Sequence, residues 1–220
     1  MPFIKGQTDQ VLVNSFWIDT KAVTNADYLQ FVAANPQWSK SQVKRIFADE
    51  NYLSHWNLEQ EGTGRFAELA PVVNVSWFAA QAYCEWQGKR LPELHEWEFA
   101  AKALPVENQF YDSLQRIISD WYSNRLRNNF EVGSLYQNTY GAWDMHGLIW
   151  EWVYDFNSIT MNDDGRNQEE MPEGLFCGSA SLNANDATDY ASFVRFAFRT
   201  SLKGNYSLRR LGFRCAKTAD

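Results

Sequence analysis

The sequence predicts a single irregular α+β domain over residues 1–220, on the basis of three observations. Apolar residues recur with helical or strand periodicity only over short stretches, so the expected elements are short. The segments between them are long and polar, and no stretch of the sequence repeats. Short helices and strands in mixed order are typical of one α+β domain, and 220 residues are enough to bury a sizeable core.

Aromatic residues are unusually frequent in this chain. They make up 16% of it and include ten Trp. Trp is bulky and amphipathic, so such enrichment accompanies either an irregular core filled by large side chains or a binding surface rich in anchoring residues. Core filling is the commoner use of any single Trp.

The first expected elements are a strand and a helix. Phe16 to Ile18 belong to an extended pattern. Thr24 is a good N-cap, and Asp27 three residues later completes an approximate capping box. The helix should end at Asn35-Pro36, because proline disfavours helical backbone in the residue before it. The polar stretch that follows is expected to be a long loop with a short helix near Ser41 to Phe47.

The central segment predicts a strand followed by two helices. Val72 to Val75 is rich in β-branched residues and ends at Ser76, a good N-cap for the next helix. Apolar residues then recur at helical spacing until Gly88, which easily adopts the left-handed conformation that ends a helix. Pro92 suits the first turn of the second helix, and Trp97 should lie on its apolar side.

Later elements are predicted from weaker patterns. Leu114 to Trp121 favours a short helix. Trp150, Trp152 and Tyr154 alternate with other residues, which favours a strand with one aromatic face.

Charge and hydropathy exclude two classes of partner. The formal net charge is −7 and the isoelectric point is about 5.0. Nonspecific binding to nucleic acid or to an anionic membrane rests on Lys and Arg meeting phosphate, and this chain has no basic stripe. No apolar run approaches the roughly 20 residues of a membrane span. We therefore expect no nucleic-acid partner and no membrane span.

Five stretches of the chain, taken in order, resemble the landmarks of a known family. They are VSWFAAQAYCEWQGKRLPELHEWEFAAK, YGAWDMHGLIWEW, CGSAS, RFAFRTS and LGFRCA. Their order resembles that of the formylglycine-generating enzyme (sulfatase-modifying factor) family, and the likeness runs from about Val11 to Ala216. The resemblance implies a variant of the C-type lectin fold with little regular secondary structure, which agrees with the irregular α+β domain expected above.

The resemblance also implies a disulfide between two of the three cysteines. In family members the cysteine of the AYC motif is bridged to the cysteine after GFR, and these positions are Cys84 and Cys215 here. Two buried thiols in contact are the alternative. A bridge would favour an oxidising compartment, so we expect a periplasmic or secreted protein if it forms and a cytoplasmic one otherwise.

The copper site of the family is where this sequence departs from the pattern. Family enzymes oxidise a cysteine of a sulfatase to formylglycine with a copper ion held by two cysteines, between the GGS motif and the run before GFR. Here that interval contains no cysteine. Counting back from Arg199, the two positions fall at about Asp186 and Ala191, whereas counting forward from Ser179 the first falls at Leu182. Cys177 lies nearby but replaces a glycine of the motif. We do not expect copper, and Cys177 is a catalytic candidate only as a lone functional thiol, with a buried structural cysteine as the alternative.

Calcium is the other metal that the resemblance implies. Family members bind it through main-chain carbonyls and an Asn in a G-N-x-W-E-W run. Leu148 replaces that Asn here, whereas Glu151 is kept and Asn124 matches another family ligand. Calcium takes six to eight oxygens, so the loss of one side chain need not abolish a site. Glu151 and Asn124 are therefore the candidate ligands, with a buried hydrogen-bonded carboxylate as the alternative role of Glu151.

A cluster of arginines in the last third suggests a binding groove. Arg195, Arg199 and Arg214 belong to this cluster within an acidic protein, and Arg can bind a carboxylate bidentately. With Ser179 and Trp150 they would line a groove that holds an acidic ligand or peptide. Internal ion pairing with the many acids is the alternative for these arginines.

Two functions remain open from the sequence. The first is a non-catalytic family member that binds a protein or peptide partner, with an accessory role toward a redox enzyme as one version. The second is a metal-dependent oxidase with altered site chemistry that modifies a cysteine-containing substrate through Cys177 or an unrecognised metal site.

Overall fold

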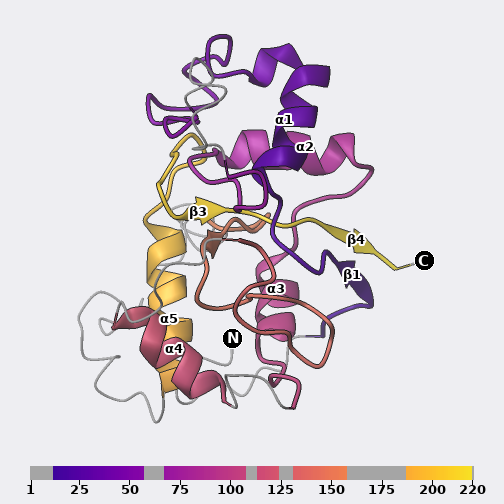
Figure 1. The fold of residues 1–220 in the computed structure, drawn as a ribbon, viewed down its shortest axis with the longest axis vertical. Coiled ribbons are helices and arrows are strands. Elements are labelled where there is room, and N and C mark those ends of the chain that lie inside the picture. Colours follow the sequence, from indigo (N-terminus) through magenta and orange to yellow (C-terminus); the bar gives the residue numbers. More distant parts are fainter. Residues whose placement is uncertain (1–11, 57–66, 108–112, 124–130, 158–186, 220) are drawn as a thin grey trace, which may run out of the picture.

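Two small sheets pair strands near the C-terminus with strands from earlier in the chain (Figure 1). The computed structural model describes residues 12–56, 67–107, 113–123, 131–157 and 187–219. Strand β1 (Phe16–Ile18) pairs antiparallel with β4 (Ala216–Thr218), so the first and last strands lie together. Strand β2 (Trp150–Glu151) pairs in parallel with β3 (Leu211–Gly212). Few helices and two-stranded sheets are compatible with an α+β domain.

The helices are short and lie around these sheets. In order they are α1 (Asn25–Ala34), the 3₁₀ helix η1 (Pro36–Trp38), α2 (Trp77–Trp86), α3 (Leu94–Ala101), α4 (Leu114–Tyr122) and α5 (Ala187–Thr200). In Figure 1, α1 and α2 lie together at one end of the molecule, and α4 lies against α5 at the other. No helix in the described part of the chain is long and apolar enough to cross a membrane.

The predicted helix caps are confirmed. The Thr24 hydroxyl accepts a hydrogen bond from Asp27 N at 3.1 Å, and the Asp27 carboxylate accepts from Thr24 N at 3.2 Å, which completes the capping box. The Ser76 hydroxyl accepts from Ala79 N at 3.2 Å at the start of α2. Gly88 follows the end of α2 with a positive φ of 68°. These local signals are reliable because each cap is satisfied by residues within one turn.

Several predicted elements do not form. Val72 to Val75 is not a strand, because Asn74 has a positive φ of 54° that interrupts the extended backbone. Pro92 lies before the N-cap Glu93 rather than inside α3. Ser41 to Phe47 forms turns instead of a helix, and the alternating segment after Trp150 is a strand for only two residues. The helix near Leu114 is confirmed as α4.

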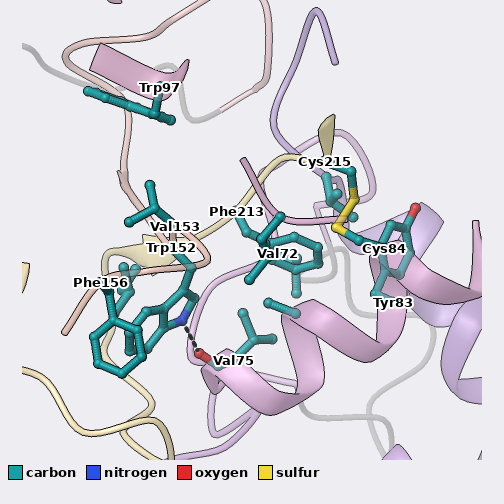
Figure 2. Packing of buried hydrophobic residues seen from close by; sticks show 14 of the residues in the cluster. Val72, Val75, Tyr83, Cys84, Trp97, Trp152, Val153, Phe156, Phe213 and Cys215 are labelled. Carbon is teal, nitrogen blue, oxygen red and sulfur yellow. Dashed lines mark hydrogen bonds between the residues drawn. A yellow bond between two sulfur atoms is a disulfide. The ribbon is translucent and has the colours of Figure 1, made fainter. Parts of the chain in front are cut away.

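The core is rich in aromatic residues, and the part of it drawn in Figure 2 includes residues of α2 and of the segments after β2 and β3. Trp152 is almost fully buried, and its indole nitrogen donates to the carbonyl of Val75 at 2.9 Å. Phe213, which follows β3, packs edge-on against Tyr83 of α2 with the ring centroids 5.3 Å apart. The short elements enclose an interior of irregular shape, and large aromatic side chains fill it.

The disulfide between Cys84 and Cys215 is present in the structure. It joins α2 to the residue before β4, across 131 positions of sequence, and both cysteines are fully buried. The Cα atoms lie 5.6 Å apart, within the usual range for a disulfide. The bridge therefore fixes the C-terminal strand to the first half of the chain.

The disulfide should be visible in both mass and stability. Alkylation in denaturant without reductant should label only Cys177, and reduction should lower the free energy of unfolding by about 4–5 kcal/mol because the closed loop is long. Intact-mass measurement and urea unfolding check the two expectations. A Cys177→Ser variant is the control, since it should keep the same response to reductant. Labelling of all three cysteines would reject the bridge.

Gly212 in β3 should tolerate no side chain. A Cβ atom at this position would collide with the carbonyl oxygen of Val72 and lie 2.8 Å from Cδ1 of Ile149. Gly212→Ala should therefore lower the free energy of unfolding by about 3 kcal/mol. Gly88→Ala is the matched control: its φ is positive but nothing lies within 4 Å, so the cost should be only about 1 kcal/mol. Equal unfolding midpoints for the two variants would contradict this.

Candidate functional site

A buried carboxylate on α3 meets two arginines of α5. The Glu98 oxygens accept from Arg195 Nε and Nη2 at 2.9 and 2.7 Å, and from Arg199 Nη1 at 2.8 Å. Residues four apart lie on one face of a helix, so α5 presents both guanidinium groups to the same acid. All three side chains are buried. The arrangement ties α5 to α3 from inside the molecule.

Trp97, the residue before Glu98, lies against both arginines and extends the network. The guanidinium carbons of Arg195 and Arg199 lie 5.3 and 4.7 Å from the centroid of its indole ring, within range of a cation–π interaction. Its indole nitrogen donates to Glu151 Oε2 at 2.7 Å. One side chain thus links the first ion pair to a second.

The second ion pair joins Glu151 of β2 to Arg214. Arg214 Nε donates to Glu151 Oε2 and Nη2 to Oε1, both at 2.8 Å, which is the bidentate geometry that Arg and carboxylate favour. Arg214 also donates to the carbonyls of Asp19, Thr20 and Trp143. Both side chains of the pair are almost fully buried. We call the set of Trp97, Glu98, Glu151, Arg195, Arg199 and Arg214 the buried ion-pair network.

The electrostatics of this network favour the charged form of Glu98. Burial alone would raise the pKa of Glu98, but Arg195 and Arg199 outweigh it and lower the pKa to about 2. His146 packs edge-on against Trp97, and its Nε2 is 2.9 Å from the carbonyl oxygen of Ala101. Burial, together with the nearby charge of Arg195, lowers the His146 pKa to about 3, so its ring is neutral at physiological pH. Neutral Nε2–H is then the donor to Ala101.

The predicted binding arginines are therefore internal. Arg195, Arg199 and Arg214 are 2%, 5% and 0% exposed, so their guanidinium groups do not face a groove. The alternative raised by the sequence, internal ion pairing with acids, is what the structure shows for all three. A guanidinium that already binds a buried carboxylate cannot also recognise a partner from outside.

Among the members of the predicted binding set that the structure describes, Trp150 is the one that is partly accessible. Its ring is partly buried and packs against Phe198 of α5 and Trp121 of α4, with centroids 4.5 and 4.9 Å apart. Tyr122 lies at 6.3 Å on the same cluster. These contacts join α4, α5 and β2, so Trp150 has a packing role whether or not it also touches a partner. Ser179, Cys177 and Asn124 lie outside the described residues.

The calcium prediction does not fit the geometry at Glu151. Both of its carboxylate oxygens accept from Arg214, and Oε2 also accepts from Trp97. A calcium ion needs carboxylate oxygens free to coordinate it, and a bidentate guanidinium takes their place here. The described residues include no group of three or more His, Cys, Asp or Glu side chains placed to hold a metal. Glu151 thus has the alternative role raised above, a buried hydrogen-bonded carboxylate.

One position expected for a copper ligand is described by the structure. Ala191 lies in α5 and is fully buried in the hydrophobic core. A methyl group packed in the core supplies no metal ligand. Asp186, the other position, lies outside the described residues.

Sequence reasoning missed one of the two acids of the network, Glu98. Glu98 was not singled out, although it stands between Trp97 and Phe99 in a helix that buries most of its residues. Glu96 of the same helix also forms a bidentate pair with Arg90, at 2.6 and 2.7 Å. An acid on the apolar side of a predicted core helix was the available signal, because a buried carboxylate requires a cation.

These features define a class of protein: a small α+β domain with little regular secondary structure, held by a long-range disulfide and a buried ion-pair network. The model of the sulfatase-modifying factor enzyme 1-like domain matches residues 5–219. The chain therefore belongs to the formylglycine-generating enzyme (sulfatase-modifying factor) family.

The curated relatives of this chain carry different activities in their names. The inactive C-alpha-formylglycine-generating enzyme 2 of Mus musculus is 28% identical over 98% of this chain and 79% of its own length. The formylglycine-generating enzyme of Streptomyces coelicolor is 29% identical over 96% of this chain and 80% of its own. The serine/threonine-protein kinase pkn1 of Chlamydia pneumoniae is 27% identical over 99% of this chain, which spans only 36% of that protein. The family thus includes proteins named as active and as inactive.

Removing the Glu98 charge should destabilise the fold strongly. Glu98→Gln leaves two buried guanidinium groups without their carboxylate, so the free energy of unfolding should fall by about 3–5 kcal/mol at pH 7. The matched control is Glu50→Gln, the same substitution in the exposed Arg45–Glu50 pair, which should change stability by less than about 1 kcal/mol. Urea unfolding of both variants measures the difference.

The same variant tests the lowered pKa. The Glu98 pKa is lower in the folded state, so its stabilising contribution is present above the unfolded value of about 4.5 and is lost as the pH falls toward about 2. The wild type should lose stability over this window more steeply than Glu98→Gln. Parallel stability profiles would show that Glu98 is not ion-paired in solution.

Proposed function

We propose that this protein is a non-catalytic binding module of its family that acts as an accessory to a partner protein or peptide, a redox enzyme being one candidate. The absence of cysteine from the interval GSASLNANDATDYASFVRFAFR carries the proposal. The family's oxidation uses copper held by two thiolates, and soft thiolates are the ligands that Cu(I) prefers. With Cys84 and Cys215 bridged, Cys177 is the only cysteine left in the chain. One thiol cannot replace the pair.

The helix α5 supports the same conclusion. The buried Ala191 stands where one thiolate is expected, and Arg195 and Arg199 of the same helix are committed to Glu98. This part of the chain therefore serves the interior of the domain. A relative of Mus musculus that is named as an inactive formylglycine-generating enzyme is 28% identical over 98% of this chain, which supports a comparison with an inactive family member.

Fold type and compartment complete the proposal. Family membership and the short, irregular elements support a C-type-lectin-like fold. The disulfide supports an oxidising compartment, the periplasm or the exterior, where such bonds persist.

Copper loading separates this function from an oxidase with altered chemistry. After incubation with Cu(I) and desalting, the protein should retain no stoichiometric copper, and it should consume no oxygen with a cysteine-containing peptide. Metal analysis and an oxygen electrode measure the two. Stoichiometric copper together with oxygen uptake, both lost in Cys177→Ser, would overturn the proposal in favour of the oxidase.

Partner recovery tests the binding role itself. Tagged protein purified from its native source should bring down a defined protein, identified by mass spectrometry. An unrelated acidic protein with the same tag is the control. If the two preparations contain the same proteins, the binding role is rejected.

A further inference from the structure

A row of contacting aromatic rings, none of them part of the buried ion-pair network, reaches the surface. We call it the aromatic strip, and it consists of Trp38, Phe47, Phe78, Trp77 and Tyr154. Successive ring centroids along this row lie 5.9, 5.5, 5.4 and 5.9 Å apart. Phe47 and Tyr154 are 37% and 50% exposed, and the three rings between and beside them are partly buried. Contiguous exposed apolar surface, as opposed to single scattered side chains, is typical of an interaction site.

The strip is held in place by the fold. The indole nitrogen of Trp77 donates to the carbonyl of Val153 at 3.0 Å, which fixes the first residue of α2 to the segment that carries Tyr154. The ring of Phe78 lies directly on Gly204, where a Cβ atom would be 3.0 Å from it. Rings fixed in this way lose little conformational freedom when they bind a partner.

Positive charge borders the strip, although the protein as a whole is acidic. Three exposed cations, Lys40, Lys44 and Arg45, lie in the segment between Trp38 and Phe47 of the strip. A fourth, Lys203, is exposed and precedes Gly204, which contacts Phe78. Ile46, which is 71% exposed, lies among them. By formal charge the four cations exceed the two acids of the same loops, Asp49 and Glu50; the Asp49 carboxylate accepts from the backbone N of Asn51 and Ser207. Asp155 follows Tyr154 at the opposite end of the strip, and its carboxylate accepts from the backbone N of Leu94. Glu50 makes only a 3.9 Å pair with Arg45, in which both side chains are largely exposed.

We infer that the aromatic strip and this basic border form a docking surface for an acidic protein segment that carries apolar side chains. The inference rests on the proposed binding role and identifies the surface and the chemistry of the partner. Aromatic anchors supply contact area, and the opposite charges set orientation and raise the association rate. A protein segment fits better than nucleic acid or an anionic membrane, because the net charge of −7 repels an extended polyanion beyond the contact itself.

The direct test uses a defined peptide rather than an unknown partner. The probe is a fluorescein-labelled twelve-residue peptide of Glu, Leu and Trp, and fluorescence anisotropy measures its affinity. Two comparison peptides replace all Glu by Lys or all Leu and Trp by Ala. The first peptide should bind, with an affinity that falls as salt rises, and both comparison peptides should bind at least about tenfold more weakly.

Matched variants locate the binding on the strip. The double variant Lys44→Glu with Lys203→Glu should bind the Glu-containing peptide about tenfold more weakly, or weaker still. Ile46→Ser should also lower the affinity for this peptide. The controls are Lys102→Glu with Lys217→Glu, which changes net charge equally, and Leu104→Ser, which removes an exposed apolar residue from elsewhere. These controls should leave the affinity within about twofold of the wild type. Equal losses in variants and controls would overturn the inference.

Three other outcomes also overturn it. Binding to phosphatidylserine vesicles but not to the peptide would identify the surface as a membrane site. A dimer that Lys44→Glu with Lys203→Glu converts to a monomer would make a second copy the occupant. Recovery of the same native partner by the wild type and by this variant would reject the surface while the proposed function stands; recovery of none by the wild type rejects the proposed function itself.

Discussion

The pairing of two buried carboxylates with three buried guanidinium groups is the constraint on which this fold depends. Glu98 of α3 pairs with Arg195 and Arg199 of α5. Glu151 of β2 pairs with Arg214, which lies between β3 and β4. Taking these charges out of water is costly unless each finds a partner, so the segments that carry them must assemble together. With strands of two or three residues, backbone ladders hold little of the chain, and side-chain pairing replaces them.

The same pairing leaves these three arginines unavailable to a partner. A cluster of arginines in an acidic chain suggests a ligand site. An arginine that is paired with a buried acid, however, is not available to a ligand. Here the three arginines serve the interior, because each is buried against an acid. The surface that combines exposed aromatic rings with cations lies instead around the start of α2 and the loop after η1. In the docking surface that we propose, the positive charge is carried by Lys40, Lys44, Arg45 and Lys203 of the loops.

The elements that could be predicted from sequence are those with local causes. The N-caps Thr24 and Ser76 and the glycine after α2 act within one helical turn, and the structure contains all three. The predictions that failed depended on distant contacts. Val72 to Val75 has the composition of a strand, but Asn74 adopts a left-handed conformation and its backbone N donates to Leu208, far along the chain. Composition gives the conformation that a segment favours by itself, and tertiary contacts determine whether the segment adopts that conformation in the fold.

The sequence by itself determined that the family's pair of copper-binding cysteines is missing, since the identity of a residue needs no fold to be known. Through resemblance it also indicated the partners Cys84 and Cys215. Only the tertiary structure decided that Arg199 binds Glu98, 101 positions away, and that Glu151 is saturated by Arg214. Whether a charged side chain faces solvent or an opposite charge depends on which segments pack together, and that information is absent from any local pattern.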